Sequence, residues 1–172
     1  MSARNLDGYG SPPIAWSAVE QQLRTNVPQV PGTGGPDRHT AWLTTIGADG
    51  VPHVRPLGVV THDGRWYFNS SGETRKTRNL EADPRCVLSL ATDPFDLVLE
   101  GVAVRVVDPA ELAAVAAVFN EDWPCEVEGD ALTAEFSAPS GGTPPYYVFR
   151  MDPGRVYAFG TREPYGATRF DV

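Results

Sequence analysis

The chain has 172 residues, 41% of them hydrophobic and 21% charged, which is long enough for one domain with its own core. A net charge of −8 excludes the generally basic surface of a duplex nucleic-acid binder, and no apolar run is long enough to cross a membrane. The first residues lack the apolar stretch of a signal peptide, so a cytoplasmic location is expected.

Two regions are expected, an N-terminal arm over residues 1–36 and a body over residues 37–172. Residues 1–14 are rich in Gly and Pro and are predicted to be irregular. Trp16, Val19 and Leu23 recur at helical spacing, which predicts a short amphipathic helix. A stretch rich in Gly and Pro then predicts a linker up to residue 36.

Three strands joined by tight hairpins are predicted next, over residues 40–46, 51–60 and 65–69. Pro52 and Pro56 each remove a hydrogen-bond donor from the middle strand. This predicts a sheet edge or a bulge there, where a ligand can meet bare backbone.

A helix is predicted to follow the third strand. Ser70 and Glu73 have the spacing of a capping box, and Pro84 ends the helix. Three cations, Arg75, Lys76 and Arg78, fall in its first two turns. Cations at a helix N-terminus are mildly unfavourable unless an anion is near, so the pattern favours a phosphate site.

Alternatives remain for these cations. Nearby acids can balance them on a solvated helix face. Arg55 is expected to reach the same anion, because a tight meander would place its strand beside the Trp66 strand. By spacing alone, Arg55 is equally compatible with a surface arginine.

Further strands are predicted over residues 86–90 and 97–107. Asp108, Pro109 and Glu111 predict a capped helix that runs to Phe119. A weaker helix is expected over residues 131–136, then a hairpin formed by residues 146–151 and 156–159. The tail, residues 161–170, shows no periodicity. Six or seven strands with short helices predict a mainly β protein, an antiparallel barrel with added helices.

The sequence contains none of the common motifs for metal binding, nucleophilic catalysis or nucleotide binding. The three histidines share no metal-ligand spacing, and neither a nucleophile elbow nor a phosphate-binding P-loop occurs. The glycines of residues 32–35 follow no strand. Cys86 and Cys125 indicate no disulfide framework. Trp66, Tyr67 and Phe68 are expected in the core, and no catalytic side chain or metal site is predicted.

The negative charge is confined to one segment. Between Arg105 and Arg150 there are eight acids and no Lys or Arg, and the other 14 acids equal the 14 bases. A local cation cluster on an otherwise balanced surface suits a small anionic ligand better than nucleic acid.

Several of these residues together resemble a known family. The series is Pro52-x-x-Arg55, Trp66-Tyr-Phe-Asn69, Thr74-Arg-Lys76, Asn79-Leu80, Asp83-Pro84-Arg85 and Glu100-Gly101. It resembles the pyridoxamine 5′-phosphate oxidase-like, FMN-binding split-barrel superfamily, which also contains deazaflavin F420-dependent reductases. The resemblance implies a six-stranded antiparallel split β-barrel with flanking helices.

The resemblance also implies a cofactor site. Arg55 and Lys76 correspond to the family's phosphate-binding cations, and Thr74 supplies a hydroxyl. Pro56 and Leu57 would offer backbone to the cofactor ring, and Phe68, Asn69 and Ser70 would line the ribityl and phosphate channel. Arg75, with Arg78, would serve the longer anionic tail of F420. Family members are homodimers with the cofactor at the interface, where the tail around Arg169 would complete the partner's site.

Two departures from the family pattern narrow the expected activity. Asp96 or a neighbour replaces a usual glutamine, and the C-terminal tryptophan-and-arginine substrate motif is missing, which argues against vitamin B6 oxidation. The expectation is an oxidoreductase that uses FMN, or alternatively F420, to transfer hydride to or from a small organic substrate. The alternatives are a non-catalytic flavin- or haem-binding or sensing module on the same barrel, and a plain interaction domain.

Overall fold

The computed structural model describes residues 1–24, 41–138 and 140–172. The predicted linker, the glycines at 32–35, His39 and the boundary between residues 36 and 37 lie outside these ranges. The elements are β1 (Ser2–Asn5), α1 (Trp16–Arg24), β2 (Ala41–Ile46), β3 (Pro52–Leu57), β4 (Val60–His62), β5 (Arg65–Ser71), α2 (Arg75–Ala82), β6 (Arg85–Ala91), β7 (Phe95–Arg105), α3 (Pro109–Phe119), β8 (Glu126–Glu128), β9 (Ala131–Thr133), β10 (Tyr146–Gly160) and β11 (Ala167–Asp171). None of the described helices is long and apolar enough to span a membrane.

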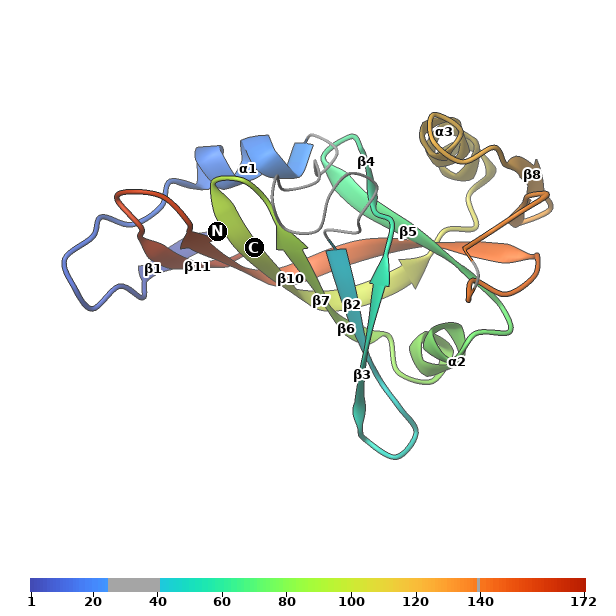
Figure 1. Ribbon diagram of the computed structural model, residues 1–172, viewed down its shortest axis with the longest axis horizontal. Coiled ribbons are helices and arrows are strands. Elements are labelled where there is room, and N and C mark those ends of the chain that lie inside the picture. Colours follow the sequence, from blue (N-terminus) through green and yellow to red (C-terminus); the bar gives the residue numbers. More distant parts are fainter. Residues whose placement is uncertain (25–40, 139) are drawn as a thin grey trace.

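The sheet is built around β10, the long strand that runs the length of the molecule in Figure 1. All strand pairs are antiparallel, and the main order is β1-β11-β10-β7-β6-β2-β3. The first half of β10 also pairs with β5, which pairs with β4. This confirms the predicted mainly β, antiparallel class with flanking helices.

The predicted hairpin within β10 is wrong. Asp152, Pro153 and Gly154 do not reverse the chain, and β10 continues along β7 with a register shift between Pro153 and Arg155. The turn-like sequence therefore makes a β-bulge. Gly101 of β7 faces it so closely that a Cβ would lie 2.2 Å from the Asp152 carbonyl oxygen.

The predicted meander of three strands is also wrong in part. β3 pairs with β2 at the edge of the sheet, as Pro52 and Pro56 predicted. Among the described strands, however, β5 has β4 and β10 as its neighbours. The chain leaves the β3 edge at Gly58 and begins a separate short hairpin, whose turn places Asp63 and Gly64 at positive φ. Arg55 is thus not on a strand next to Trp66.

Three segments for which the sequence pattern predicted no strand form strands in the structure. Residues 131–133 form β9 where a helix was predicted, and residues 2–5 and 167–171 form β1 and β11, which pair with each other. Thr168 and Phe170 face inward, so the tail did carry a strand-like alternation. This strand has only five residues, too few for the alternation to stand out in the sequence.

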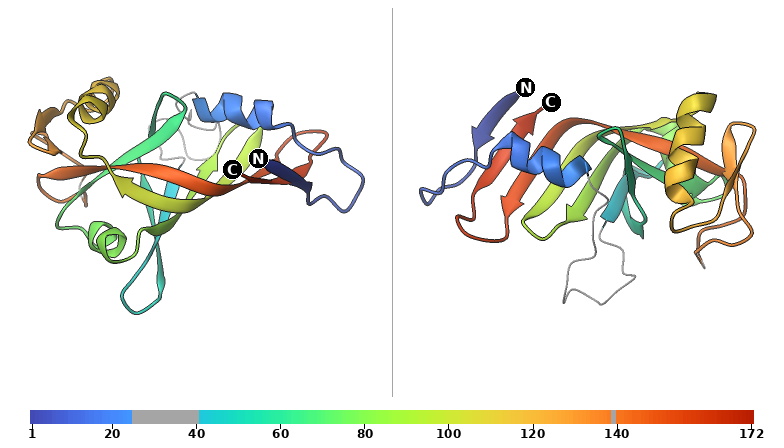
Figure 2. Two further views of the ribbon diagram at one scale, coloured as in Figure 1. Left: turned by 180° about the vertical axis from the view of Figure 1, so that it is seen from behind. Right: turned by 90° about the horizontal axis from the view of Figure 1, so that it is seen from above.

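The core has two parts. Inside the barrel, Phe68 stacks on Phe149 at 5.4 Å between ring centroids. The predicted α1 closes this part with Val19 and Leu23, both buried, and Figure 2 shows α1 crossing the strands. The second part lies beneath α3 at the other end of β10, around Tyr67. The prediction of a buried aromatic strand is confirmed.

Both cysteines are buried and unpaired. Burial raises the pKa of the Cys86 thiol to about 12, and Cys86 Sγ contacts Met151 Sδ at 3.4 Å. Cys86 is therefore a small core residue and not a thiolate nucleophile.

Candidate functional site

The start of α2 differs from the predicted capping box. The N-cap is Thr74, whose Oγ1 accepts from the Thr77 backbone N–H at 3.4 Å. Because β5 continues through Ser71, the helix begins later than a Ser70 cap would require. The Glu73 carboxylate instead accepts a hydrogen bond from the Thr143 hydroxyl at 3.0 Å.

A cavity of about 400 Å³ opens at this helix start. It lies between the β2–β3 hairpin, α2 and the loop before β10. Its lining residues are Thr45, His53, Arg55, Pro56, Glu73, Thr74, Arg75, Lys76, Ser140 and Gly142. The first N–H groups of a helix have no intrahelical acceptor, so Arg75 and Lys76 also direct backbone donors to this end of α2.

Two cations in this cavity lack an acidic partner. Burial lowers the pKa of Lys76, and the nearby charge of Arg55 lowers it further. In the described part of the chain neither residue forms an ion pair, and Arg55 Nη1 donates only to the carbonyl of Val54, at 2.7 Å. Lys76 is partly buried, whereas Arg55 is exposed, as a surface arginine would be. Two like charges held close together in one cavity are stabilised by a bound anion.

Arg75 differs from these two residues. Its guanidinium lies 3.7 Å from the Asp49 carboxylate at the tip of the β2–β3 hairpin, and both side chains are more than half exposed. Arg75 therefore contributes less uncompensated positive charge to the cavity than Arg55 and Lys76 do.

Four hydroxyl residues form a compact network beneath the cavity. Thr74 Oγ1 lies 2.7 Å from Ser70 Oγ and 3.1 Å from Thr77 Oγ1. Thr77 Oγ1 is 2.8 Å from Ser70 Oγ and donates to the Ser71 carbonyl at 2.7 Å. Thr77 and Ser71 are fully buried. The network fixes where the Thr74 hydroxyl sits relative to the cations.

A second cavity, of about 220 Å³, adjoins the first. The two cavities share Pro56, Lys76 and Ser140. The other residues of the second are Leu57, Gly58, Asn69, Ser70, Phe119, Trp123, Ser137, Ala138 and Gly141. A charged compartment thus continues into one with aromatic, aliphatic and hydroxyl groups, which suits a ligand with an anionic end and a larger uncharged body.

The structure brings together eight of the nine predicted cofactor residues. The first cavity contains Arg55, Pro56, Thr74, Arg75 and Lys76, and the second adds Leu57, Asn69 and Ser70. Phe68 lines neither cavity, because its ring is buried against Phe149. Arg169 lies on β11, where it donates to Asp171 at 3.0 Å, and it too lines neither cavity.

Several cavity residues were not predicted. Thr45 and His53 are opposite each other in the β2–β3 ladder. His53 lies two residues before Arg55 on the same face of β3, so the register of the predicted hairpin would have indicated that both residues lie near Arg55. Phe119 is the last residue of α3, Trp123 lies in the turn after it, and the residues at 140–142 come from a loop. No local sequence pattern marks these as neighbours of β5.

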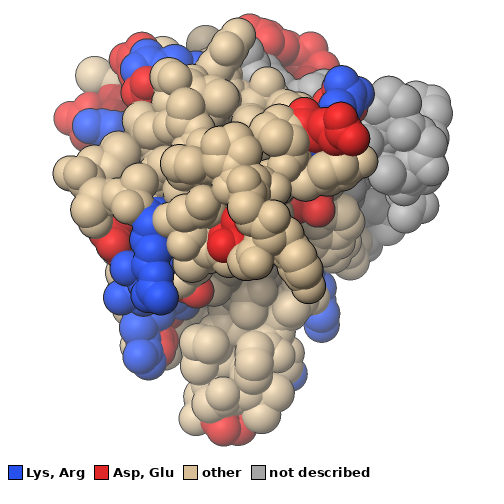
Figure 3. All heavy atoms as spheres, turned by 90° about the vertical axis from the view of Figure 1, so that its left-hand side faces the viewer, with Lys and Arg blue, Asp and Glu red and all other residues tan. Residues whose placement is uncertain are grey.

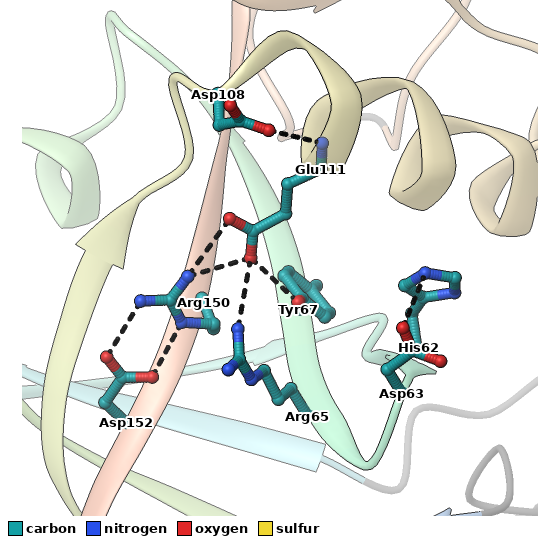
Figure 4. A network of polar contacts seen from close by, with 8 residues as sticks. All are labelled: His62, Asp63, Arg65, Tyr67, Asp108, Glu111, Arg150 and Asp152. Atoms are coloured by element: carbon teal, nitrogen blue, oxygen red, sulfur yellow. Dashed lines mark hydrogen bonds and ion pairs between the residues drawn. The ribbon is translucent and has the colours of Figure 1, made fainter.

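A separate polar cluster joins α3 to β10 and β5 (Figure 4). Arg150 Nη1 donates to Glu111 Oε1 at 2.8 Å, and the Tyr67 hydroxyl donates to the same oxygen at 2.9 Å. Arg150 also binds Asp152. Burial alone would raise the pKa of Glu111, but the hydrogen bonds from Arg150 and Tyr67 outweigh it and lower that pKa.

This cluster corrects one prediction. Asp108 does cap α3, by accepting from the Glu111 N–H at 2.8 Å, but the Glu111 side chain turns to Arg150 instead of back to the cap. Since Glu111 and Arg150 are each largely buried and mutually paired, the cluster holds α3 on the sheet. Among the described residues, no group of His, Cys, Asp and Glu is placed to hold a metal ion.

Comparison with known proteins identifies the family of this chain and structures that share its fold. Residues 35–160 match the family model described as pyridoxamine 5′-phosphate oxidase. No curated protein matches the sequence. Among solved structures, the conserved hypothetical protein Rv2991 from Mycobacterium tuberculosis is similar at a TM-score of 0.60 and 19% identity, with 91% of each chain covered.

Two other solved structures share the fold. A heme binding protein from Mycobacterium smegmatis has a TM-score of 0.56 at 18% identity, with 88% of this chain and 57% of that chain covered. A structure described as F420 reductase has a TM-score of 0.51 at 16% identity, with 80% and 94% covered. At these identities the likeness shows a common split-barrel fold.

Proposed function

The chain belongs to the pyridoxamine 5′-phosphate oxidase family, and from this premise we propose that it is an oxidoreductase that binds FMN between β3 and α2. The observation that carries the proposal is the pair formed by the exposed Arg55 and the partly buried Lys76, two cations without an acidic partner in the described chain, at one end of a double cavity. The phosphate of FMN would supply the missing negative charge.

The residues present fit such a phosphate. Arg55 and Lys76 offer charged donors, Thr74 a hydroxyl and the start of α2 free backbone N–H groups. Asn69 and Ser70 in the second cavity offer polar groups for a ribityl chain, and Pro56 and Leu57 lie beside them on the edge strand.

The bound cofactor would supply the hydride chemistry itself. The side chains of the protein would bind the phosphate, orient the ring and exclude water, and none is assigned as an acid or base. Phe119 and Trp123 form an apolar wall of the second cavity, suited to a small organic substrate. Without the tryptophan-and-arginine motif, pyridoxamine phosphate is not the proposed substrate.

FMN is favoured over F420 by the charges at the site. FMN needs one phosphate site, and Arg55 with Lys76 provides one. The longer anionic tail of F420 would need further cations, but Arg75 is already close to Asp49, and Arg78 is exposed and lines neither cavity. F420 is therefore the second choice.

We also propose a homodimer in which the partner covers the site. Trp42 and Val54 are exposed on the outer face of β2 and β3, and Trp42 pairs across the ladder with Pro56, which lines both cavities. An aromatic residue exposed beside a ligand site is typical of an interface.

A non-catalytic haem-binding or sensing module is the second candidate. His53 favours it, because an imidazole in the cation cavity could ligate haem iron while Arg55 and Lys76 meet the propionates. The heme binding protein with the same fold gives this candidate a precedent.

Titration of the purified protein with FMN, F420 and haem tests these assignments. We expect FMN to bind most tightly and Lys76→Ala to weaken it by at least about tenfold. Arg78→Ala is the matched control, since it removes a cation from the same helix outside the cavity. Equal loss in both variants, or tighter binding of F420 that depends on Arg78, would exclude FMN. A haem absorption band lost in His53→Ala would favour the sensing module.

A further inference from the structure

The Ser71 carbonyl oxygen, beneath the cation cavity, has more donors than it can use. Within 3.1 Å it faces the Thr74 N–H at 3.1 Å, the Thr74 hydroxyl at 3.0 Å and the Thr77 hydroxyl at 2.7 Å. A carbonyl oxygen has two lone pairs, so two of these donors satisfy it. One hydroxyl proton is therefore available elsewhere.

The available proton is that of Thr74. Thr77 is fully buried and lines neither cavity, so its proton can serve only the network. Thr74 lines the cation cavity. With the backbone N–H and the Thr77 hydroxyl on the carbonyl, the remaining acceptor of the Thr74 hydroxyl in the network is Ser70 Oγ, at 2.7 Å. The Thr74 hydroxyl can rotate from there and donate to an oxyanion in the cavity.

We propose that Thr77 is a positioning residue that releases the Thr74 hydroxyl for a phosphate bound by Arg55 and Lys76; the inference rests on the proposed phosphate site. Without the Thr77 hydroxyl, the Thr74 hydroxyl would become the second donor to the Ser71 carbonyl, beside the Thr74 backbone N–H, and its proton would be held there. Thr77 thus acts on the ligand without touching it.

Binding of FMN and of inorganic pyrophosphate to Thr77→Val, Thr77→Ser and wild type tests the proposal. Valine keeps the shape and removes the hydroxyl, whereas serine keeps the hydroxyl. We expect Thr77→Val to weaken both ligands about tenfold, the usual effect of one hydrogen bond to a charged group, and Thr77→Ser to restore both.

A double-mutant cycle separates positioning from a general structural role. In a Thr74→Ala background the proton that Thr77 releases no longer exists, so Thr77→Val should cause no further loss of affinity. A loss of the same size in both backgrounds, or unchanged affinity in Thr77→Val alone, would overturn the role of Thr77 while leaving the phosphate site intact.

Pyrophosphate distinguishes this failure from failure of the proposed function. If wild type binds pyrophosphate but no flavin, and Thr77→Val weakens it, the positioning role stands and the FMN assignment falls. If wild type binds neither ligand, the phosphate site and the role of Thr77 are both wrong.

Discussion

At the scale of single residues, the site is defined by charges left without partners. Most of the arginines in the described chain lie within 4 Å of a carboxylate, for example Arg85 at Asp83 and Arg105 at Asp130. Arg55 and Lys76 do not, and they sit in a cavity beside one another. A partly buried lysine beside a second cation lowers stability, and proteins keep such an arrangement where binding requires it.

Lys76→Met should therefore stabilise the ligand-free protein while weakening FMN binding. The pKa of Lys76 is lowered by burial and by Arg55, so its charged form is disfavoured in the folded state at neutral pH, and this penalty is relieved only as the pH rises through that lowered pKa. We expect a higher Tm near pH 7 than in wild type. Arg78→Met is the control, and a lower Tm in Lys76→Met would contradict the reasoning.

The individual cations could be predicted from the sequence, whereas their arrangement could not. Arg75 and Lys76 lie at the same helix start as Thr74, so their spacing along the sequence was sufficient to predict that the three residues lie together. Arg55 lies near them because of a strand arrangement that the sequence did not indicate: β3 lies at the sheet edge and not beside β5. The structure places Arg55 in the same cavity as the start of α2, as predicted, but the strand pairing behind that prediction is wrong, and anion binding by Arg55 stays a prediction.

At the scale of elements, β10 and its bulge organise the barrel. The Asp152-Pro153-Gly154 sequence is typical of a turn, but long-range pairing with β7 keeps the chain extended and absorbs the extra residue as a bulge. Local turn signals cannot reveal such pairing. The helices α1 and α3 could be predicted, because amphipathic spacing and a local cap define them.

Gly101→Ala should severely destabilise the protein. The added Cβ would lie 2.2 Å from the Asp152 carbonyl oxygen and 2.7 Å from Pro153 Cα, both backbone atoms that cannot move without breaking the bulge. We expect a loss of about 3 kcal/mol or more in the free energy of unfolding, measured with urea. Gly154→Ala, whose Cβ would meet nothing within 4 Å, is the control and should change stability by less than about 0.5 kcal/mol.

Glu111→Gln should destabilise the protein in a pH-dependent way. Its folded-state pKa lies below the usual 4.5, so its contribution is complete above that pH and is lost as the pH falls through the lowered value. We expect a loss of about 1–2 kcal/mol at pH 7 that shrinks below pH 4.

Urea unfolding of wild type and Glu111→Gln from pH 7 to pH 3 measures this effect. The exposed Glu128 provides the control as Glu128→Gln, which should follow wild type throughout. A pH-independent loss in Glu111→Gln would mean that packing, and not the charge on Glu111, holds α3 in place.

At the scale of the whole molecule, charge and exposed apolar groups are unevenly distributed. In Figure 3 the end of the molecule that carries β1 and β11 is mostly uncharged, with both basic and acidic groups around its edges. The acidic excess lies in the segment of α3, β8 and β9. The cation cavity itself is positive, since Arg55, Arg75 and Lys76 line it with one acid, Glu73.

Trp42→Glu should weaken the proposed homodimer. Trp42 is 38% exposed on β2 opposite Pro56, and a charge there would be buried on association. We expect wild type to have twice the chain mass by light scattering and the variant to move toward the monomer mass. Arg85→Glu on the neighbouring strand, also exposed, serves as a comparison that places a carboxylate elsewhere on the sheet and should disturb the assembly less. A monomeric wild type would contradict the homodimer.

The family and barrel class could be predicted from residues 40–107, because the motifs there follow one another in order. The loop at 140–142 and the aromatic residues after α3 belong to the site only through the folding of β10 against β5. Long-range contacts of this kind leave no local pattern, which is why this part of the site was not predicted.

The central claim is that a phosphate binds between Arg55 and Lys76, and the affinity of FMN compared with that of riboflavin tests it most directly. The two flavins differ only by the phosphate. We predict that FMN binds about a hundredfold more tightly to wild type, as expected for a phosphate held by two cations, and that Lys76→Ala removes most of this difference. Equal affinity for the two flavins, or a preference for FMN unchanged in Lys76→Ala, would contradict the account.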